Sequence, residues 1–284
     1  MELVGRIETR PVEGARDLDL FVKLPFRLPE QRPNRVPPLL TDEREFHDPK
    51  KNPQLTQCDV QRWVAWRDGK VVGRIMGIIQ KSYNAAHGER TARFYNLDCV
   101  RDADVVHALI GATEQWARSK GMDRMIGPFG FSDKDPQGLQ IEGFEHLPVI
   151  ATPINPDWLP PMVDACGYTG YEDMVSYRMD IPLRLPEVYH AIGERCLRNH
   201  GLHRVPLRTK GELRPWVVPV LRLVNATYGD LLGFGLGCEC VNPVPASWPG
   251  RSKAQALPGR SVSIARSRSL SGRTATLSWA RRLG

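Results

Sequence analysis

The segment from residue 91 to residue 130 constrains the fold more than any other part of the chain. Val105, Leu109 and Trp116 recur at helical spacing, so one face of a helix in this segment should be buried. Short apolar runs on both sides of the helix have the composition of strands. The pattern predicts strand, helix and strand at residues 93–100, 103–121 and 124–126. A unit of this length normally forms a right-handed parallel crossover, so we expect an α/β layer built around it.

Both ends of the predicted helix carry recognisable signals. Asp102 or Asp104 can accept hydrogen bonds from the first backbone N–H groups of the helix. Gly121 lies where a left-handed residue is expected to end it. Upstream, Asp68 and Gly69 separate two β-rich runs, at residues 60–67 and 70–79, and this dipeptide favours a tight hairpin turn. The pattern also predicts loops at residues 81–90 and, rich in glycine, after residue 126. Further along, it predicts a helix that begins at Pro186, a strand at residues 200–208 and a helix at residues 217–228.

Composition predicts a globular chain with substantial cores. It has 284 residues, of which 41% are hydrophobic and 25% charged, enough for one large or two ordinary domains. No apolar run approaches the roughly 18 residues of a membrane span, and the N-terminus lacks a signal-peptide pattern, which together predict a cytoplasmic protein. The scattered cysteines Cys58, Cys99, Cys166 and Cys196 lack metal-ligand spacing, so we expect reduced, mostly buried thiols and no metal.

The positive charge of the chain lies in its C-terminal part. Residues 235–284 hold eight Lys/Arg and one acid, and subtracting these from the chain's 39 bases and 32 acids leaves 31 of each. The body is therefore neutral and lacks the basic bias of a nucleic-acid-binding domain. We predict an α/β domain at residues 1–182, the start of an incomplete second domain at 183–234 and a disordered basic tail at 235–284.

Two interpretations of this tail remain open. An Arg/Ser-rich arm can bind RNA or another polyanion. Alternatively, the tail is an out-of-frame or otherwise non-native ending, because the periodic pattern stops in mid-domain after the sequence YGDLLGF. The second interpretation is favoured, since arms usually follow a completed core.

Several phrases of the sequence resemble the GNAT acyltransferase superfamily. WRDGKVVGRIMG is similar to its second and third strands, and ATEQWARSKGMDRM to its central helix and following strand. KNP, GPFGFSDKDPQGLQIEGFE and INPDWLPPMVDACGY resemble an uncharacterised bacterial GNAT-like family of longer proteins, whose members continue into a second, related half. The resemblance covers residues 1–234 and implies a mixed central sheet flanked by helices.

The resemblance also implies a cofactor site. Acetyl-CoA or another acyl-CoA would lie where two strands diverge, against Leu97, Asp98, Cys99, Val100 and Asp104. The superfamily holds the pyrophosphate with a glycine-rich loop at the start of the central helix, where N–H groups and the helix dipole favour an anion. Here the corresponding loop has no glycine and places two aspartates at that position.

Catalytic candidates are fewer. The resemblance implies acyl transfer from a thioester to a small-molecule amine, with Glu142 as a base and Tyr168 or Tyr177 as an acid. The tyrosine that many family enzymes carry in the late helix is replaced by Val163. A GNAT-like ligand-binding or scaffold protein that has lost CoA binding is therefore the alternative. The sequence specifies no oligomeric state.

Overall fold

The computed structural model describes residues 5–28, 35–148, 152–177, 183–199, 204–228 and 273–283. These residues fall into two compact units. The first comprises Met1–Tyr177, Leu232–Gly235 and Ser271–Gly284, and the second comprises Arg178–Leu231 and Leu236–Leu270.

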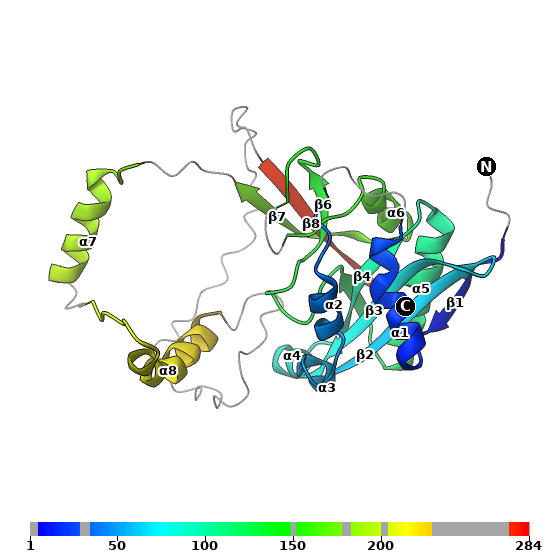
Figure 1. Cartoon of the computed structure of the whole chain (residues 1–284), viewed down its shortest axis with the longest axis horizontal. Helices are drawn as coiled ribbons and strands as arrows, with labels where there is room; N and C mark the ends of the chain where they lie inside the picture. The colour runs from blue at the N-terminus through cyan, green and yellow to red at the C-terminus, as the bar shows by residue number, and fades with distance from the viewer. Residues whose placement is uncertain are drawn as a thin grey trace. The chain divides into compact units, whose positions relative to one another are not determined.

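The first unit is built on a mixed sheet (Figure 1). Its strands are β1 (Glu8–Pro11), β2 (Cys58–Arg67), β3 (Lys70–Gln80), β4 (Thr91–Cys99), β5 (Arg124–Gly127), β6 (Leu139–Glu142), β7 (Thr169–Tyr177) and β8 (Arg273–Arg282). The order is β1-β2-β3-β4-β5-β8-β6, and β7 also pairs with β8. Strands β4 and β5 are parallel and the other described pairs are antiparallel. The predicted fold class, a mixed sheet flanked by helices, is confirmed.

Helices cover both faces of this sheet. They are α1 (Gly14–Lys23), followed by a 3-10 turn (Leu24–Phe26), α2 (Leu40–Phe46), α3 (Gln54–Gln57), α4 (Lys81–His87), α5 (Ala103–Ser119) and α6 (Leu159–Ala165). Ile75 belongs to a core that includes α5 and α6, and its neighbour Met76 belongs to a second core that includes α1. Successive side chains of a strand point to opposite faces, so the sheet separates the two cores.

The local signals identified in the sequence are confirmed. Asp68 and Gly69 adopt φ values of 49° and 74° between β2 and β3, which are the positive angles expected of this hairpin turn. Asp102 caps α5 and Gly121 follows that helix with φ 77°. The predicted crossover from β4 through α5 to a parallel β5 is present. Cys58, Cys99 and Cys166 are buried free thiols, as predicted.

Three local predictions were wrong. Residues 81–90, predicted as a loop, contain α4, and the glycine-rich loop after β5 contains the strand β6. Residues 204–208, part of a predicted strand, form no regular element, and residues 200–203 lie outside the described residues. The second unit contains α7 (Glu187–Asn199) and α8 (Lys210–Tyr228), where helices were predicted. Its interpretation as the start of an incomplete domain stays a prediction.

The last part of the predicted disordered tail is a strand, which corrects the sequence-based interpretation. β8 pairs with β5, β6 and β7. Figure 1 shows it beside the labelled strands β6 and β7. Trp279 is 1% exposed and its indole N–H donates to Asp164 at the end of α6. The upstream Ser, Gly and Arg residues dominate the tail's average composition, so they conceal a ten-residue strand that carries Leu277 and Trp279. Residues 235–272 lie outside the described residues.

Replacing Trp279 tests the place of β8 in the sheet. Trp279→Ala should lower the free energy of unfolding by about 3–5 kcal/mol, because a large buried side chain leaves a cavity and Asp164 loses its donor. Arg282→Ala, at an exposed position of the same strand, should cost less than about 0.5 kcal/mol. Urea unfolding followed by circular dichroism measures both. Equal effects of the two substitutions would contradict the pairing of β8.

Candidate functional site

Strands β4 and β5 separate soon after they begin. They pair only at Thr91, Ala92 and Arg93 of β4, although β4 continues to Cys99. One further hydrogen bond, from the Phe129 N–H to the Phe94 carbonyl at 2.7 Å, follows the last pair. Beyond it, no strand among the described residues pairs with this side of β4. The predicted divergence of the two strands is therefore present.

A β-bulge lies in β4 where the strands have separated. Met76 pairs with Tyr95 and Arg74 with Asp98, so Asn96 and Leu97 together oppose one residue of β3. Asn96 has φ 49°, a left-handed conformation that asparagine tolerates better than most residues. Bulges redirect backbone groups and are common beside active sites.

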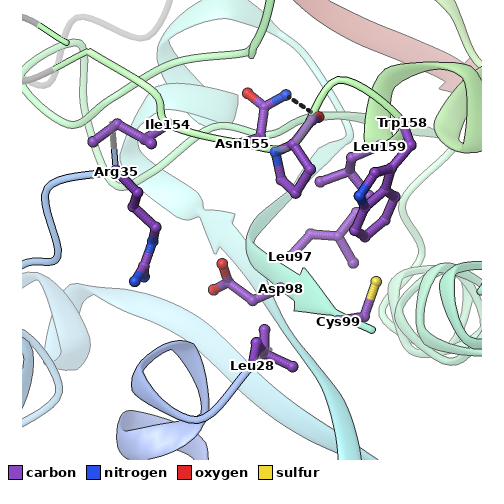
Figure 2. A pocket seen from close by; sticks show the side chains of 10 residues that line it. Leu28, Arg35, Leu97, Asp98, Cys99, Ile154, Asn155, Trp158 and Leu159 are labelled. Carbon is purple, nitrogen blue, oxygen red and sulfur yellow. Dashed lines mark hydrogen bonds between the residues drawn. The ribbon is translucent and has the colours of Figure 1, made fainter. Parts of the chain in front are cut away.

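A small pocket borders this separated edge of β4. We call it the β4–α6 pocket. Figure 2 shows Leu97, Asp98 and Cys99 of β4 on one side and Trp158 and Leu159, at the start of α6, on another. Its volume is ≈ 20 Å³, room for about one water molecule. The remaining lining residues are Leu28, Arg35, Ile154, Asn155 and Pro156.

Charged and polar groups fix the walls of the pocket. Arg74, buried under α1, donates to Asp98 at 2.8 Å and to the Phe21 carbonyl at 3.0 Å. On the opposite wall, Asn155 accepts from the Gln140 N–H at 2.6 Å and donates to the Gln140 carbonyl at 3.2 Å. The segment before α6 is thereby tied to β6. Burial lowers the pKa of Arg35, and the nearby Asp98 opposes this shift.

The N-terminus of α5 is occupied by the chain's own side chains. Asp102 accepts from the backbone N–H of Asp104 at 2.9 Å and of Val105 at 3.4 Å. Its other oxygen accepts from Arg67 at 2.6 Å. Burial alone would raise the pKa of Asp102, but the hydrogen bonds from Arg67 and the helix lower it below its usual value. The diphosphate of an acyl-CoA therefore does not fit here, because the donors it would need already hold a carboxylate.

The predicted cofactor-binding residues are only partly brought together. Leu97, Asp98 and Cys99 line the β4–α6 pocket. Val100 follows β4 and its N–H donates to the Val72 carbonyl at 2.9 Å. Asp104 is exposed in the first turn of α5 and does not line that pocket. Their roles in binding a donor stay predictions.

The predicted catalytic residues do not line the β4–α6 pocket. Tyr168 is buried, and its hydroxyl donates to Glu114 at 3.1 Å. Arg281 of β8 donates to the same carboxylate at 3.0 Å. Burial, followed by the charge of Glu114, raises the pKa of Tyr168. Glu142 is exposed at the end of β6, while for Tyr177 only the backbone of β7 is described, so their catalytic roles stay predictions.

Sequence reasoning missed four residues of this region. Asn96, Arg35, Asn155 and Trp158 form the bulge or line the pocket. Asparagine is depleted in strands, so Asn96 within an apolar run was a usable signal for a bulge. The other three come from segments distant in sequence, and no spacing rule connects them to β4.

An open, acid-rich hollow lies beside α2 and α3, with a volume of ≈ 410 Å³. We call it the α2–α3 hollow. The rings of Phe46 and Phe131 line it, and their centres lie 5.3 Å apart. The centre of the Phe46 ring also lies 5.9 Å from that of Tyr95 in β4. Burial raises the pKa of Asp135, which accepts from the Ser132 N–H at 3.2 Å. The remaining lining residues are Asp42, Glu45, Lys51, Asn52 and Gln54.

His47 supports the aromatic wall of this hollow. It is 2% exposed, contacts the Phe46 ring edge-on at 5.1 Å and accepts from Arg62 at 3.2 Å. Burial, reinforced by the charges of Arg62 and Arg74, lowers the pKa of His47 to about 2. The folded protein therefore keeps this imidazole neutral.

Comparisons with known proteins identify relatives in sequence and similar solved structures. No protein-family model matches the chain. Protein YghO of Escherichia coli (strain K12) is 34% identical over 163 residues, covering 57% of this chain and 42% of that protein. A bacterial ceramide synthase of Caulobacter vibrioides (strain NA1000 / CB15N) is 31% identical over 179 residues, covering 63% of this chain and 47% of that protein. This chain thus spans less than half the length of either relative.

The similar solved structures include a tandem GNAT protein from the clavulanic acid biosynthesis pathway. The match covers 77% of this chain and 60% of that protein's chain, with 15% sequence identity and a TM-score of 0.41. Within the described residues, none of the helices has the length and apolarity needed to cross a bilayer.

The neutral His47 predicts a pH dependence of stability. Its folded pKa of about 2 lies below the ordinary 6.5, so between these values only the unfolded chain binds the proton. Stability should therefore fall as the pH falls below 6.5, and this residue should contribute a loss of about 2 kcal/mol between pH 7 and pH 5.

Urea unfolding at the two pH values measures this effect. Between pH 7 and pH 5, the free energy of unfolding of His47→Gln should fall by about 2 kcal/mol less than that of the wild type. This difference does not depend on what the substitution itself costs at neutral pH. His107→Gln, at an exposed position of α5, should retain the wild-type pH dependence. An unchanged acid loss in His47→Gln would show that the imidazole becomes protonated in the folded state.

Proposed function

We propose that this protein is an N-acyltransferase that moves an acyl group from a thioester to an amine. The observation that carries the proposal is the separated edge of β4 beside a bulge and a pocket. One relative is named a bacterial ceramide synthase, and ceramide formation joins an acyl group to an amine. That name supports the reaction class proposed here.

The separated edge suits the amide-containing arm of a thioester donor. Backbone groups of β4 near Leu97 can pair with such an arm as they would with an added strand, without requiring particular side chains. The bulge at Asn96 redirects the backbone at this point, so a peptide N–H can donate to the thioester carbonyl oxygen as negative charge develops on it. Entry of the arm requires Trp158 or α6 to move, because the pocket of ≈ 20 Å³ holds about one water.

The amine should come from the α2–α3 hollow. Its acids favour a cationic amine, and Tyr95 connects its aromatic wall to β4. For transfer, the bound cation first gives one proton to a base, the neutral nitrogen then attacks the thioester carbonyl, the C–S bond breaks, and the second proton of that nitrogen passes to solvent. We assign this base to Asp135, and the departing thiolate takes up a proton from solvent.

Blocking the pocket tests the proposal. Purified protein is incubated with an acyl thioester and a panel of primary amines, and amide products are quantified by mass spectrometry. Leu97→Trp should reduce kcat/KM at least about tenfold, because the larger ring fills the space for the donor arm. Leu147→Trp, at a 71% exposed position, is the matched control. Unchanged activity in a folded Leu97→Trp variant would exclude this pocket as the donor site.

Removing the proposed base gives a separate prediction. Asp135→Asn should lower kcat/KM about 10²-fold while leaving thioester affinity unchanged, since the base acts on the amine. Wild-type activity should fall on the acid side, with an apparent pKa above the usual aspartate range because burial raises that of Asp135. Asp157→Asn, an exposed acid before α6, should leave both properties unchanged. An equal loss in both variants would contradict the assignment.

A non-catalytic scaffold is the second candidate. The small volume of the β4–α6 pocket and the occupied N-terminus of α5 favour it. It predicts that every thioester binds with a Kd above about 1 mM, so titration calorimetry separates it from the transferase.

A further inference from the structure

The start of α5 decides which part of a thioester donor this protein can recognise. Free N–H groups at a helix N-terminus form a site for phosphate. Here Asp102 already accepts from the N–H groups of Asp104 and Val105, and it is also hydrogen-bonded to Arg67. A diphosphate at this position would have to displace a carboxylate from both sets of donors.

Neighbouring charges do not offset this obstacle. Arg67 is 4% exposed and lies against Asp102, so its guanidinium is not presented to solvent. The exposed base Arg101 is followed closely by the exposed acid Asp104. The segment therefore presents no net positive charge to an approaching anion.

The edge of β4 imposes no such restriction. Recognition there uses backbone groups and the apolar side chains of Leu97 and Leu159, and these suit an uncharged amide arm. The two halves of a CoA thioester therefore differ in how well they fit. The pantetheine half can pair with the edge of β4, whereas the N-terminus of α5, where the nucleotide diphosphate would bind, already holds the carboxylate of Asp102.

We propose that this protein recognises its donor through the pantetheine thioester arm, and that the α5 N-terminus does not bind a nucleotide diphosphate. This inference rests on the proposed acyl transfer and deepens it, because it defines the donor class. The arm is shared by acyl-CoA and by acyl carrier protein, so either can supply it. Only acyl-CoA also carries the nucleotide diphosphate.

Calorimetric titration of the full chain distinguishes these sources. The probes are octanoyl-CoA, S-octanoyl-pantetheine, octanoyl acyl carrier protein and 3′-phosphoadenosine 5′-diphosphate. We expect octanoyl-CoA and octanoyl-pantetheine to have Kd values within about threefold of each other. The Kd of 3′-phosphoadenosine 5′-diphosphate should be above about 1 mM. Octanoyl acyl carrier protein should bind at least as tightly as octanoyl-pantetheine, and a tighter complex identifies the carrier protein as the source.

A variant adds a gain-of-binding test. Asp102→Ser keeps a helix cap but removes the charge, so Arg67 loses its carboxylate partner and can donate to a phosphate instead. Octanoyl-CoA should then bind at least about fivefold more tightly, while the Kd of octanoyl-pantetheine is unchanged. Glu145→Gln removes an equal charge at an exposed position outside this turn and should change neither affinity more than about twofold. If Asp102→Ser does not fold by circular dichroism, the wild-type comparison decides alone.

The possible failures are distinguishable. Octanoyl-CoA binding more than about tenfold tighter than octanoyl-pantetheine, with competition by the nucleotide, overturns this inference and leaves the proposed acyl transfer intact. Weaker binding of the carrier protein than of octanoyl-pantetheine also overturns the shared-arm assignment. Absence of binding by every thioester overturns the proposed function and this inference together.

Discussion

The guanidinium of Arg93 lies where the two parallel strands separate and is hydrogen-bonded to the chain that follows β5. It lies at the last β4–β5 pair, is 2% exposed, and donates to the carbonyls of Gly130 and Phe131 at 3.1 and 3.0 Å. It also lies 4.5 Å from the centre of the Phe129 ring. These contacts tie the carbonyls of the chain after β5 to the Arg93 side chain, beyond the last residues that pair with β4. Without a buried donor at this position, those carbonyls would lose their partners, and burying unpaired carbonyls is costly.

A close backbone contact completes this separation. A Cβ atom at Gly127 would lie 2.5 Å from the Phe94 carbonyl oxygen, so only glycine permits the strands to be this close just before they part. Immediately beyond, the bulge at Asn96 turns the β4 backbone. Contact, separation and bulge follow within a few residues, so the candidate donor site is a product of backbone geometry more than of particular reactive side chains.

This dependence on backbone geometry explains what the sequence revealed. The hairpin at Asp68 and Gly69 and the cap at Asp102 were predictable because each depends on neighbouring residues. The lining of the pocket was not, because Arg35 and Asn155 meet β4 only through the tertiary fold. β8 was missed for a related reason: its strand character becomes clear only when Trp279 is seen between α6 and the neighbouring strands.

Two buried arginines of this sheet donate hydrogen bonds to different kinds of acceptor. Arg93 donates to backbone carbonyls and shapes the separated edge, whereas Arg67 donates to the carboxylate that caps α5. A buried guanidinium is costly unless it is paired, so Arg67 and Asp102 stabilise each other and keep an anion from taking either one's place. The N-terminus of a helix attracts phosphate when its N–H groups are free. Here these groups and Arg67 already donate to the carboxylate of Asp102. In the proposed reaction, the strand separation would serve the thioester arm while the ion pair disfavours a nucleotide diphosphate, and different residues control these two features.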